Sequence, residues 1–160
     1  MITQLDLGDW KSYQEATLQI DSLTVVIGTN ASGKSNALDA LAFLNRIATG
    51  AMLTSALQGD GALPALRGGV EWAARKPGTR FWIGVKCKVD ELTDYYYRLE
   101  CRVSESRCDV SAESIDRIRY RPGKDATRKS EAGRIKIFRT DACTDEAPTI
   151  VANPQPKTRV

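Results

Sequence analysis

The stretch Gly28-Thr29-Asn30-Ala31-Ser32-Gly33-Lys34-Ser35 decides the fold, because it has the pattern G-x-x-x-x-G-K-S of a phosphate-binding loop, or P-loop. Its glycines allow backbone conformations that a Cβ atom would forbid, so successive N–H groups can form a nest around an anion. A helix beginning at the loop would add partial positive charge at its N-terminus. Lys34 would bring a full charge to the β- and γ-phosphates, and the Ser35 hydroxyl is placed to bind Mg²⁺. The loop therefore predicts ATP and Mg²⁺ as ligands.

The residues on either side of the loop fit its usual context, which is a buried strand before it and an amphipathic helix after it. Leu23–Ile27 reads Leu-Thr-Val-Val-Ile, a run typical of a strand buried on both faces. After the loop, Ala37, Leu41 and Leu44 recur at helical spacing, and Gly50 indicates where the helix ends. We therefore expect an α/β fold of the P-loop NTPase class.

The rest of the chain predicts an antiparallel β-meander. Met1–Leu7 and Glu15–Ile20 are expected as strands before the loop, and the alternation in Arg80–Val89 and Tyr95–Val103 predicts a hairpin after it. Further strands are expected at Cys108–Val110, Ile115–Arg121 and Arg134–Arg139, a short helix at Val70–Arg75, and a charged loop at Pro122–Gly133. Residues 141–160 show no periodicity and hold three of the six prolines, so we divide the chain into a domain at 1–140 and a linker or tail at 141–160.

Composition and charge are those of one soluble domain. The chain has 160 residues, of which 42% are hydrophobic and 27% charged, and its net charge of +3 is too small to demand a polyanionic partner. No apolar run approaches the roughly 20 residues of a membrane span, and the N-terminus lacks a signal peptide's apolar core, so we expect no membrane partner. The absence of histidine excludes Ser-His-Asp and Cys-His catalysis within the chain. Four cysteines without C-x-x-C spacing predict reduced thiols and a cytoplasmic location.

Two segments carry a resemblance to a known family. Leu5–Tyr13, with its aromatic-basic-Ser-aromatic sequence Trp-Lys-Ser-Tyr, and Val26–Leu41, with Gly-x-Asn-x-Ser-Gly-Lys-Ser-Asn, resemble the N-terminal region of ABC-type ATPases of the RecF/SMC-like group. This group is often described as AAA family ATPases and includes OLD-like and other phage-defence proteins. The resemblance implies an ABC-type N-terminal lobe in which the β-meander follows the P-loop helix.

The resemblance also implies roles for individual residues. Lys11 would approach the phosphates or ribose of the nucleotide, with Trp10 and Tyr13 flanking the pocket. The residues that would hold the triphosphate are Gly28, Asn30, Ala31, Ser32, Gly33, Lys34, Ser35 and Asn36. Family members also have a glutamine that touches Mg²⁺, and Gln58 is the only glutamine between the P-loop helix and the meander.

Several parts of the family pattern are missing. We find no Walker B strand ending in Asp-Glu, no signature motif, no D-loop and no switch histidine, and Ile135–Asp141, the nearest Walker B candidate, is interrupted by two bases. We therefore expect an incomplete nucleotide-binding domain, with ATP hydrolysis only once the Walker B and signature half completes it. The resemblance implies a homodimer through the nucleotide site, DNA and an effector nuclease subunit or domain as partners, and a role in DNA repair or anti-phage defence. A small P-loop kinase and a non-hydrolysing, nucleotide-dependent regulatory module are the alternatives.

One segment is strongly basic. Ile115–Arg139 contains nine bases and three acids, a net charge of +6. Arg117, Arg119 and Arg121 would share one face of a strand, which suggests DNA binding through counterion release. A solvated outer sheet face with a charged loop explains the same pattern, and the sequence leaves both explanations open.

Overall fold

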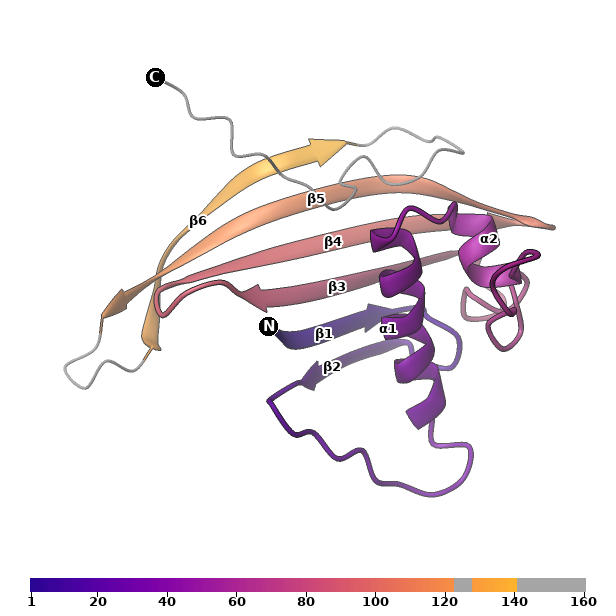
Figure 1. Ribbon diagram of the computed structural model, residues 1–160, viewed down its shortest axis with the longest axis horizontal. Coiled ribbons are helices and arrows are strands. Elements are labelled where there is room, and N and C mark those ends of the chain that lie inside the picture. Colours follow the sequence, from indigo (N-terminus) through magenta and orange to yellow (C-terminus); the bar gives the residue numbers. More distant parts are fainter. Residues whose placement is uncertain (123–127, 141–160) are drawn as a thin grey trace.

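The computed structural model describes residues 1–122 and 128–140 and is built from six strands and two helices (Figure 1). The elements in chain order are β1 (Ile2–Gly8), β2 (Glu15–Gln19), α1 (Lys34–Ala48), α2 (Leu53–Gln58), β3 (Arg80–Lys88), β4 (Thr93–Ser104), β5 (Arg107–Pro122) and β6 (Arg128–Thr140). The predicted tail at 141–160 lies outside the described residues. No helix in the described part of the chain is long and apolar enough to cross a membrane.

The strands form one antiparallel sheet in the order β2-β1-β3-β4-β5-β6, so the predicted meander is confirmed. The predicted hairpin of β3 and β4 pairs Phe81 with Cys101 and Ile83 with Leu99. The two strands predicted within β5 are one, because Ser111 lies in a β-bulge that shifts the register and lets a polar stretch continue the strand. The loop predicted at Pro122–Gly133 is too long, since β6 already begins at Arg128.

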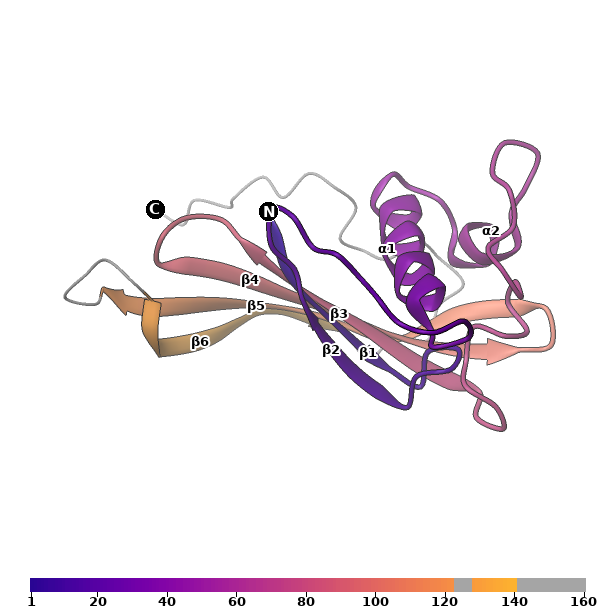
Figure 2. The ribbon, with the colours of Figure 1, turned by 90° about the horizontal axis from the view of Figure 1, so that it is seen from below.

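Both helices cover the same face of the sheet, and the core lies between them and the strands (Figure 2). Alternation along the strands turns apolar side chains such as Leu5, Ile83 and Leu99 toward the helices, where all three are fully buried. Trp10, Phe43 and Phe81 form an aromatic cluster with ring centroids 5.0 to 6.1 Å apart. We call the opposite face of the sheet the helix-free face.

Helix α1 forms where the sequence predicts it. Its buried positions Ala37, Ala40, Phe43, Leu44 and Ile47 follow the i, i+3, i+4 spacing of an amphipathic helix. It starts after Gly33, which has a left-handed backbone (φ 91°), and the chain turns away at Gly50 (φ 97°). Glycine suits both positions because a Cβ atom disfavours such backbone angles.

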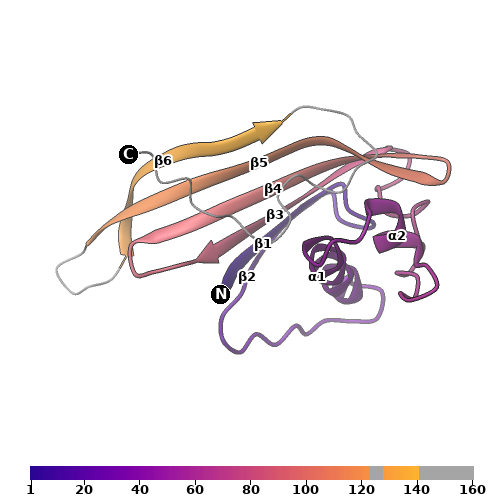
Figure 3. The ribbon, with the colours of Figure 1, turned by 45° about the horizontal axis from the view of Figure 1, so that its top comes forward.

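Two predicted elements are wrong. Leu23–Ile27 is not a strand: it is part of a connection that runs clear of the sheet from β2 to α1 (Figure 3), and Leu23, Val25 and Ile27 are 82%, 73% and 87% exposed. No strand within the described residues pairs with this run, and β-branched residues make a strand only where they find a partner. Val70–Arg75 forms turns instead of a short helix, and Ala74 makes an isolated bridge with Trp10.

Candidate functional site: the P-loop and its support

The loop Gly28–Gly33 lies exposed at the start of α1 and has the backbone features of an anion-binding turn. Ala31 and Gly33 both adopt left-handed conformations, with φ of 65° and 91°. Left-handed residues in such turns direct successive N–H groups to one side, which is how backbone nests bind phosphate. A Cβ on Gly28 would lie 2.8 Å from the Ser32 hydroxyl, so the loop is tight at its first glycine as well. α1 has 15 residues and no acid in its first turn, so its positive N-terminus is uncompensated there.

The side chain of Lys34 folds back onto the backbone of the loop. Its ammonium donates hydrogen bonds to the carbonyls of Gly28 (2.7 Å) and Thr29 (2.6 Å), and lies 3.3 Å from the Ser32 hydroxyl. The charged end of Lys34 is therefore held over the backbone that the sequence predicts to surround a phosphate. Ser35 follows in the first turn of α1, and its carbonyl accepts a hydrogen bond from Arg67 (2.8 Å).

The segment Trp10–Tyr13 supports the junction between the loop and α1. The Tyr13 hydroxyl donates to the carbonyl of Gly33 (3.0 Å), the Trp10 indole N–H donates to the carbonyl of Asn36 (2.7 Å), and the Asn36 amide donates to the Ser12 hydroxyl (2.8 Å). Burial raises the pKa of Tyr13, so its hydroxyl stays protonated as a donor at neutral pH. Tyr13 thus borders the loop, and its place beside a nucleotide stays a prediction. The prediction for Trp10 is wrong, because its ring is fully buried in the core under α1.

Lys11 belongs to a buried ion-pair network beneath the start of α1. Its ammonium donates to the Asp39 carboxylate (2.6 Å) and to the Arg67 carbonyl (2.7 Å), and the Arg67 guanidinium approaches the other Asp39 oxygen at 3.1 Å. The side chains of Lys11 and Asp39 are only 6% and 11% exposed. Desolvation lowers the pKa of Lys11, an effect that the hydrogen bond and charge of Asp39 oppose and the charge of Arg67 adds to. The role of Lys11 toward a nucleotide stays a prediction.

Asp39 and Arg67 are parts of this site that no sequence motif predicts. Asp39 could have been noticed as an acid among the apolar positions of the buried helix face, between Ala37 and Ala40. Arg67 carried no signal, because its contacts with Ser35 and Asp39 span 32 and 28 residues.

Gln58 ends α2 and is exposed beside the turn that contains Arg67. A Cβ on Gly69 in that turn would lie 3.7 Å from the Gln58 side chain. The structure therefore places Gln58 near Gly69, two residues after Arg67. The side chain of Arg67 in turn donates a hydrogen bond to the Ser35 carbonyl. A contact of Gln58 with Mg²⁺ stays a prediction.

The loop, the helix behind it and the support from Trp10–Tyr13 have the form expected of a P-loop in a nucleotide-binding protein. Residues 1–112 match the family model described as AAA ATPase domain. This match covers more than half of the chain, which therefore belongs to the AAA ATPase domain family, and this membership supports nucleotide binding. No curated protein matches the sequence.

Proposed function

We propose that this chain binds ATP and Mg²⁺ as the N-terminal lobe of an ABC-type ATPase of the RecF/SMC-like group. The observation that carries the proposal is the P-loop at the start of α1, with Lys34 held over its carbonyls and Tyr13 supporting its last glycine. The residues present fit the ligand: the glycine positions leave no room for a Cβ atom or need a left-handed backbone, and the uncompensated helix N-terminus favours an anion.

Each residue has a defined task in this proposal. The backbone from Gly28 to Asn36 would surround the phosphates, Lys34 would exchange its carbonyl partners for phosphate oxygens, and the Ser35 hydroxyl would bind Mg²⁺. Mg²⁺ supplies charge neutralisation on the β- and γ-phosphates when bound. Asn36 is already oriented by its hydrogen bond to Ser12, and Tyr13 fixes the backbone at Gly33.

We infer that hydrolysis needs residues from outside the described part of the chain. The acid closest in sequence to the loop is Asp39, and Lys11 and Arg67 already engage it. The apolar run Leu23–Ile27 is exposed directly before the loop, which supports pairing with strands supplied by further polypeptide. The resemblance to the RecF/SMC-like group supports a homodimer through the nucleotide site, and it extends to DNA and an effector nuclease as partners. DNA repair or anti-phage defence, and a cytoplasmic location, belong to the same proposal.

Equilibrium binding of a fluorescent ATP analogue tests the proposal. Lys34→Ala should weaken binding by roughly 10- to 100-fold, because it removes charge-assisted bonds of about 1.5–3 kcal/mol. Lys76→Ala is the matched control, since it removes the same charge from an exposed lysine whose ammonium lies over the ring of Trp72. Equal affinity of Lys34→Ala and Lys76→Ala would refute nucleotide binding by the loop. Phosphate release by the chain alone at about one turnover per second, lost in Lys34→Ala, would instead show that a catalytic carboxylate is already present.

A further inference from the structure

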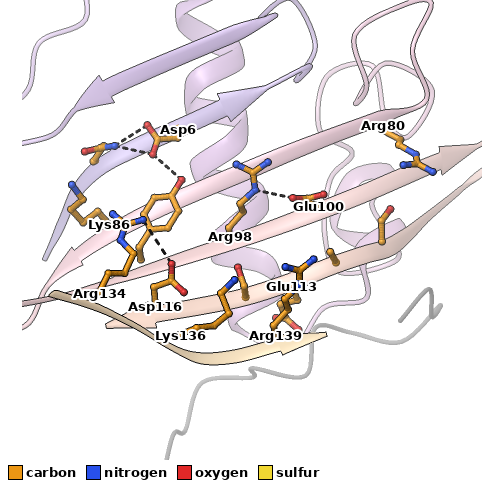
Figure 4. A pocket seen from close by; sticks show the side chains of 15 residues that line it. Asp6, Arg80, Lys86, Arg98, Glu100, Glu113, Asp116, Arg134, Lys136 and Arg139 are labelled. Atoms are coloured by element: carbon orange, nitrogen blue, oxygen red, sulfur yellow. Dashed lines mark hydrogen bonds and ion pairs between the residues drawn. The ribbon is translucent and has the colours of Figure 1, made fainter. Parts of the chain in front are cut away.

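The helix-free face of the sheet is hollowed into a trough of about 670 Å³ (Figure 4). Six basic side chains line it, and they come from the β3–β4 hairpin and from β6, which is more distant in the sequence: Arg80, Lys86, Arg98, Arg134, Lys136 and Arg139. The sequence suggests DNA binding through Arg117, Arg119 and Arg121 in β5, but Arg117 and Arg119 pair with Tyr95 and Thr93 and lie on the opposite face. The basic character of Ile115–Arg139 is thus divided between the two faces of the sheet.

The bases form two lines along the strands, with a floor of small side chains between them. Lys86, Arg98 and Arg80 lie along β3 and β4, and the second line lies along β6 (Figure 4). The second line runs from Arg134 to Arg139, five residues or about 16 Å of strand, and β4 and β6 are two strand spacings or about 10 Å apart. The floor includes the short side chains Ser111, Ala112 and Ser114. This shape suits a linear anion lying parallel to the strands.

The acids in the trough are largely engaged by their neighbours. Asp6 accepts hydrogen bonds from Gln4, Thr17 and the Tyr96 hydroxyl. Glu100 pairs with Arg98 at 2.9 Å, and one oxygen of Asp116 lies 3.8 Å from Arg134. Among the described residues, Arg80, Lys86 and Lys136 make no ion pair. These three cations are available to a ligand.

Two aromatic rings hold arginines in position above the sheet. The guanidinium of Arg98 lies 3.8 Å from the ring centre of Trp82, and that of Arg134 lies 5.8 Å from that of Tyr96. The rings lie directly over glycines: a Cβ on Gly8 would be 1.8 Å from Trp82, and one on Gly84 would be 2.2 Å from the Tyr96 hydroxyl. The arginines are therefore preorganised, which reduces the entropy that binding would cost.

Two buried polar atoms on residues that line the trough have no hydrogen-bond partner. They are the Ser111 hydroxyl and one carboxylate oxygen of Asp116. A buried polar atom without a partner is costly, so a ligand that reaches both when neighbouring side chains move aside would gain from it. Phosphate oxygens can accept from Ser111, whereas the carboxylate needs a donor such as the ring N–H of an unpaired base. A ligand with phosphates and exposed base N–H groups supplies both.

We propose that this trough binds the backbone of single-stranded nucleic acid, with phosphates along the two lines of bases. The spacing of the lines admits one backbone, and unpaired bases keep the N–H donors that Asp116 can accept. The trough would be the surface that binds the DNA partner of the proposed function, on which this inference rests. Its test contains no ATP, so it can fail or succeed independently of ATP binding by the P-loop.

Fluorescence anisotropy of a labelled 20-nucleotide oligo-dT, measured over a range of salt concentrations, tests the trough. The association constant K falls as salt rises. The double variant Lys86→Ala/Lys136→Ala should make the slope of log K against log salt less negative by about 1.4, since each phosphate contact to a single strand contributes about 0.7. If the variant and the wild type bind equally at 1 M salt, this change of slope corresponds to a loss of about 25-fold in affinity at 0.1 M salt. Lys86→Arg/Lys136→Arg keeps both charges and should bind like the wild type.

The matched control is Arg119→Ala/Lys76→Ala, which removes the same charge from exposed residues away from the trough. We expect its affinity to stay within about two-fold of the wild type. The proposal would be overturned if the control variant lost as much affinity for oligo-dT as the trough variant. It would also be overturned if the wild-type protein did not bind oligo-dT. Tighter binding of a duplex of the same length, or equal competition by inorganic polyphosphate, would overturn the assignment to single-stranded nucleic acid.

Discussion

Removing the carboxylate of Asp39 should destabilise the protein by about 2–3 kcal/mol. Loss of one partner from a fully buried ion pair costs about 3–5 kcal/mol, because the remaining charge stays desolvated. Lys11 is 6% exposed but keeps its hydrogen bond to the Arg67 carbonyl, and the side chain of Arg67 is 61% exposed, so water can solvate it. These two features reduce the expected effect of Asp39→Ala below the fully buried value. Urea unfolding at 25 °C measures it as a lower midpoint at an unchanged slope.

A double-mutant cycle separates the ion pair from packing. Lys11→Met removes the charge while keeping most of the apolar stem, so Lys11→Met/Asp39→Ala leaves no unpaired buried charge. We expect the double variant to be more stable than Asp39→Ala alone by about 1–2 kcal/mol. Arg75→Ala is the control, because Arg75 and Asp9 form an exposed pair 3.9 Å apart, which contributes less than about 0.5 kcal/mol. If Asp39→Ala costs no more than Arg75→Ala, the network beneath α1 is not the support we describe.

Two further predictions concern tyrosine hydroxyls. Tyr13→Phe should lower the free energy of unfolding in urea by about 0.5–1 kcal/mol, because it removes one hydrogen bond to the Gly33 carbonyl. The loss is small because this carbonyl still accepts a hydrogen bond from the Asn36 N–H. An unchanged urea midpoint would contradict the contact. Burial and the hydrogen bond to Asp6 raise the pKa of Tyr96 to about 12 from its ordinary 10. The folded state therefore holds this proton more tightly, and its stabilisation is complete below pH 10 and lost between pH 10 and 12. Tyr96→Phe should therefore reduce the loss of stability between pH 10 and 12 by about 1 kcal/mol after screening, and an unchanged pH dependence of the urea midpoint would contradict the bond to Asp6.

The parts of the fold that the sequence predicts correctly are those specified by local pattern. Helix α1 follows from apolar residues at helical spacing between two left-handed glycines, Gly33 and Gly50. The hairpin of β3 and β4 follows from alternation, because one face meets the core and the other does not. The bulge at Ser111 interrupts the alternation, and for this reason one long strand was predicted as two shorter ones.

The parts of the site that the sequence could not predict depend on contacts between distant residues. The P-loop motif identifies Lys34 and Ser35 because both act within one turn of chain. Asp39 and Arg67 meet across 28 residues, and the two basic lines of the trough come together only when β6 lies beside β5. Charge counted along Ile115–Arg139 gave no indication of which face each base occupies, since that depends on strand register.

The exposed run Leu23–Ile27 links the error in the predicted fold to the properties of the site. The last glycine of the P-loop is held by Tyr13 and by the first turn of α1, whereas Gly28 at the other end is held by Lys34, a residue of the loop motif itself. A strand pairing at Leu23–Ile27 would fix the backbone directly before Gly28 and bury side chains that are now 73% to 87% exposed at Leu23, Val25 and Ile27. Fixing each backbone residue costs about 1–2 kcal/mol of conformational entropy, so a loop anchored at both ends would bind the same phosphates more tightly. We infer that whatever pairs with this run also raises the affinity of the loop for nucleotide, which couples assembly of the sheet to occupation of the P-loop.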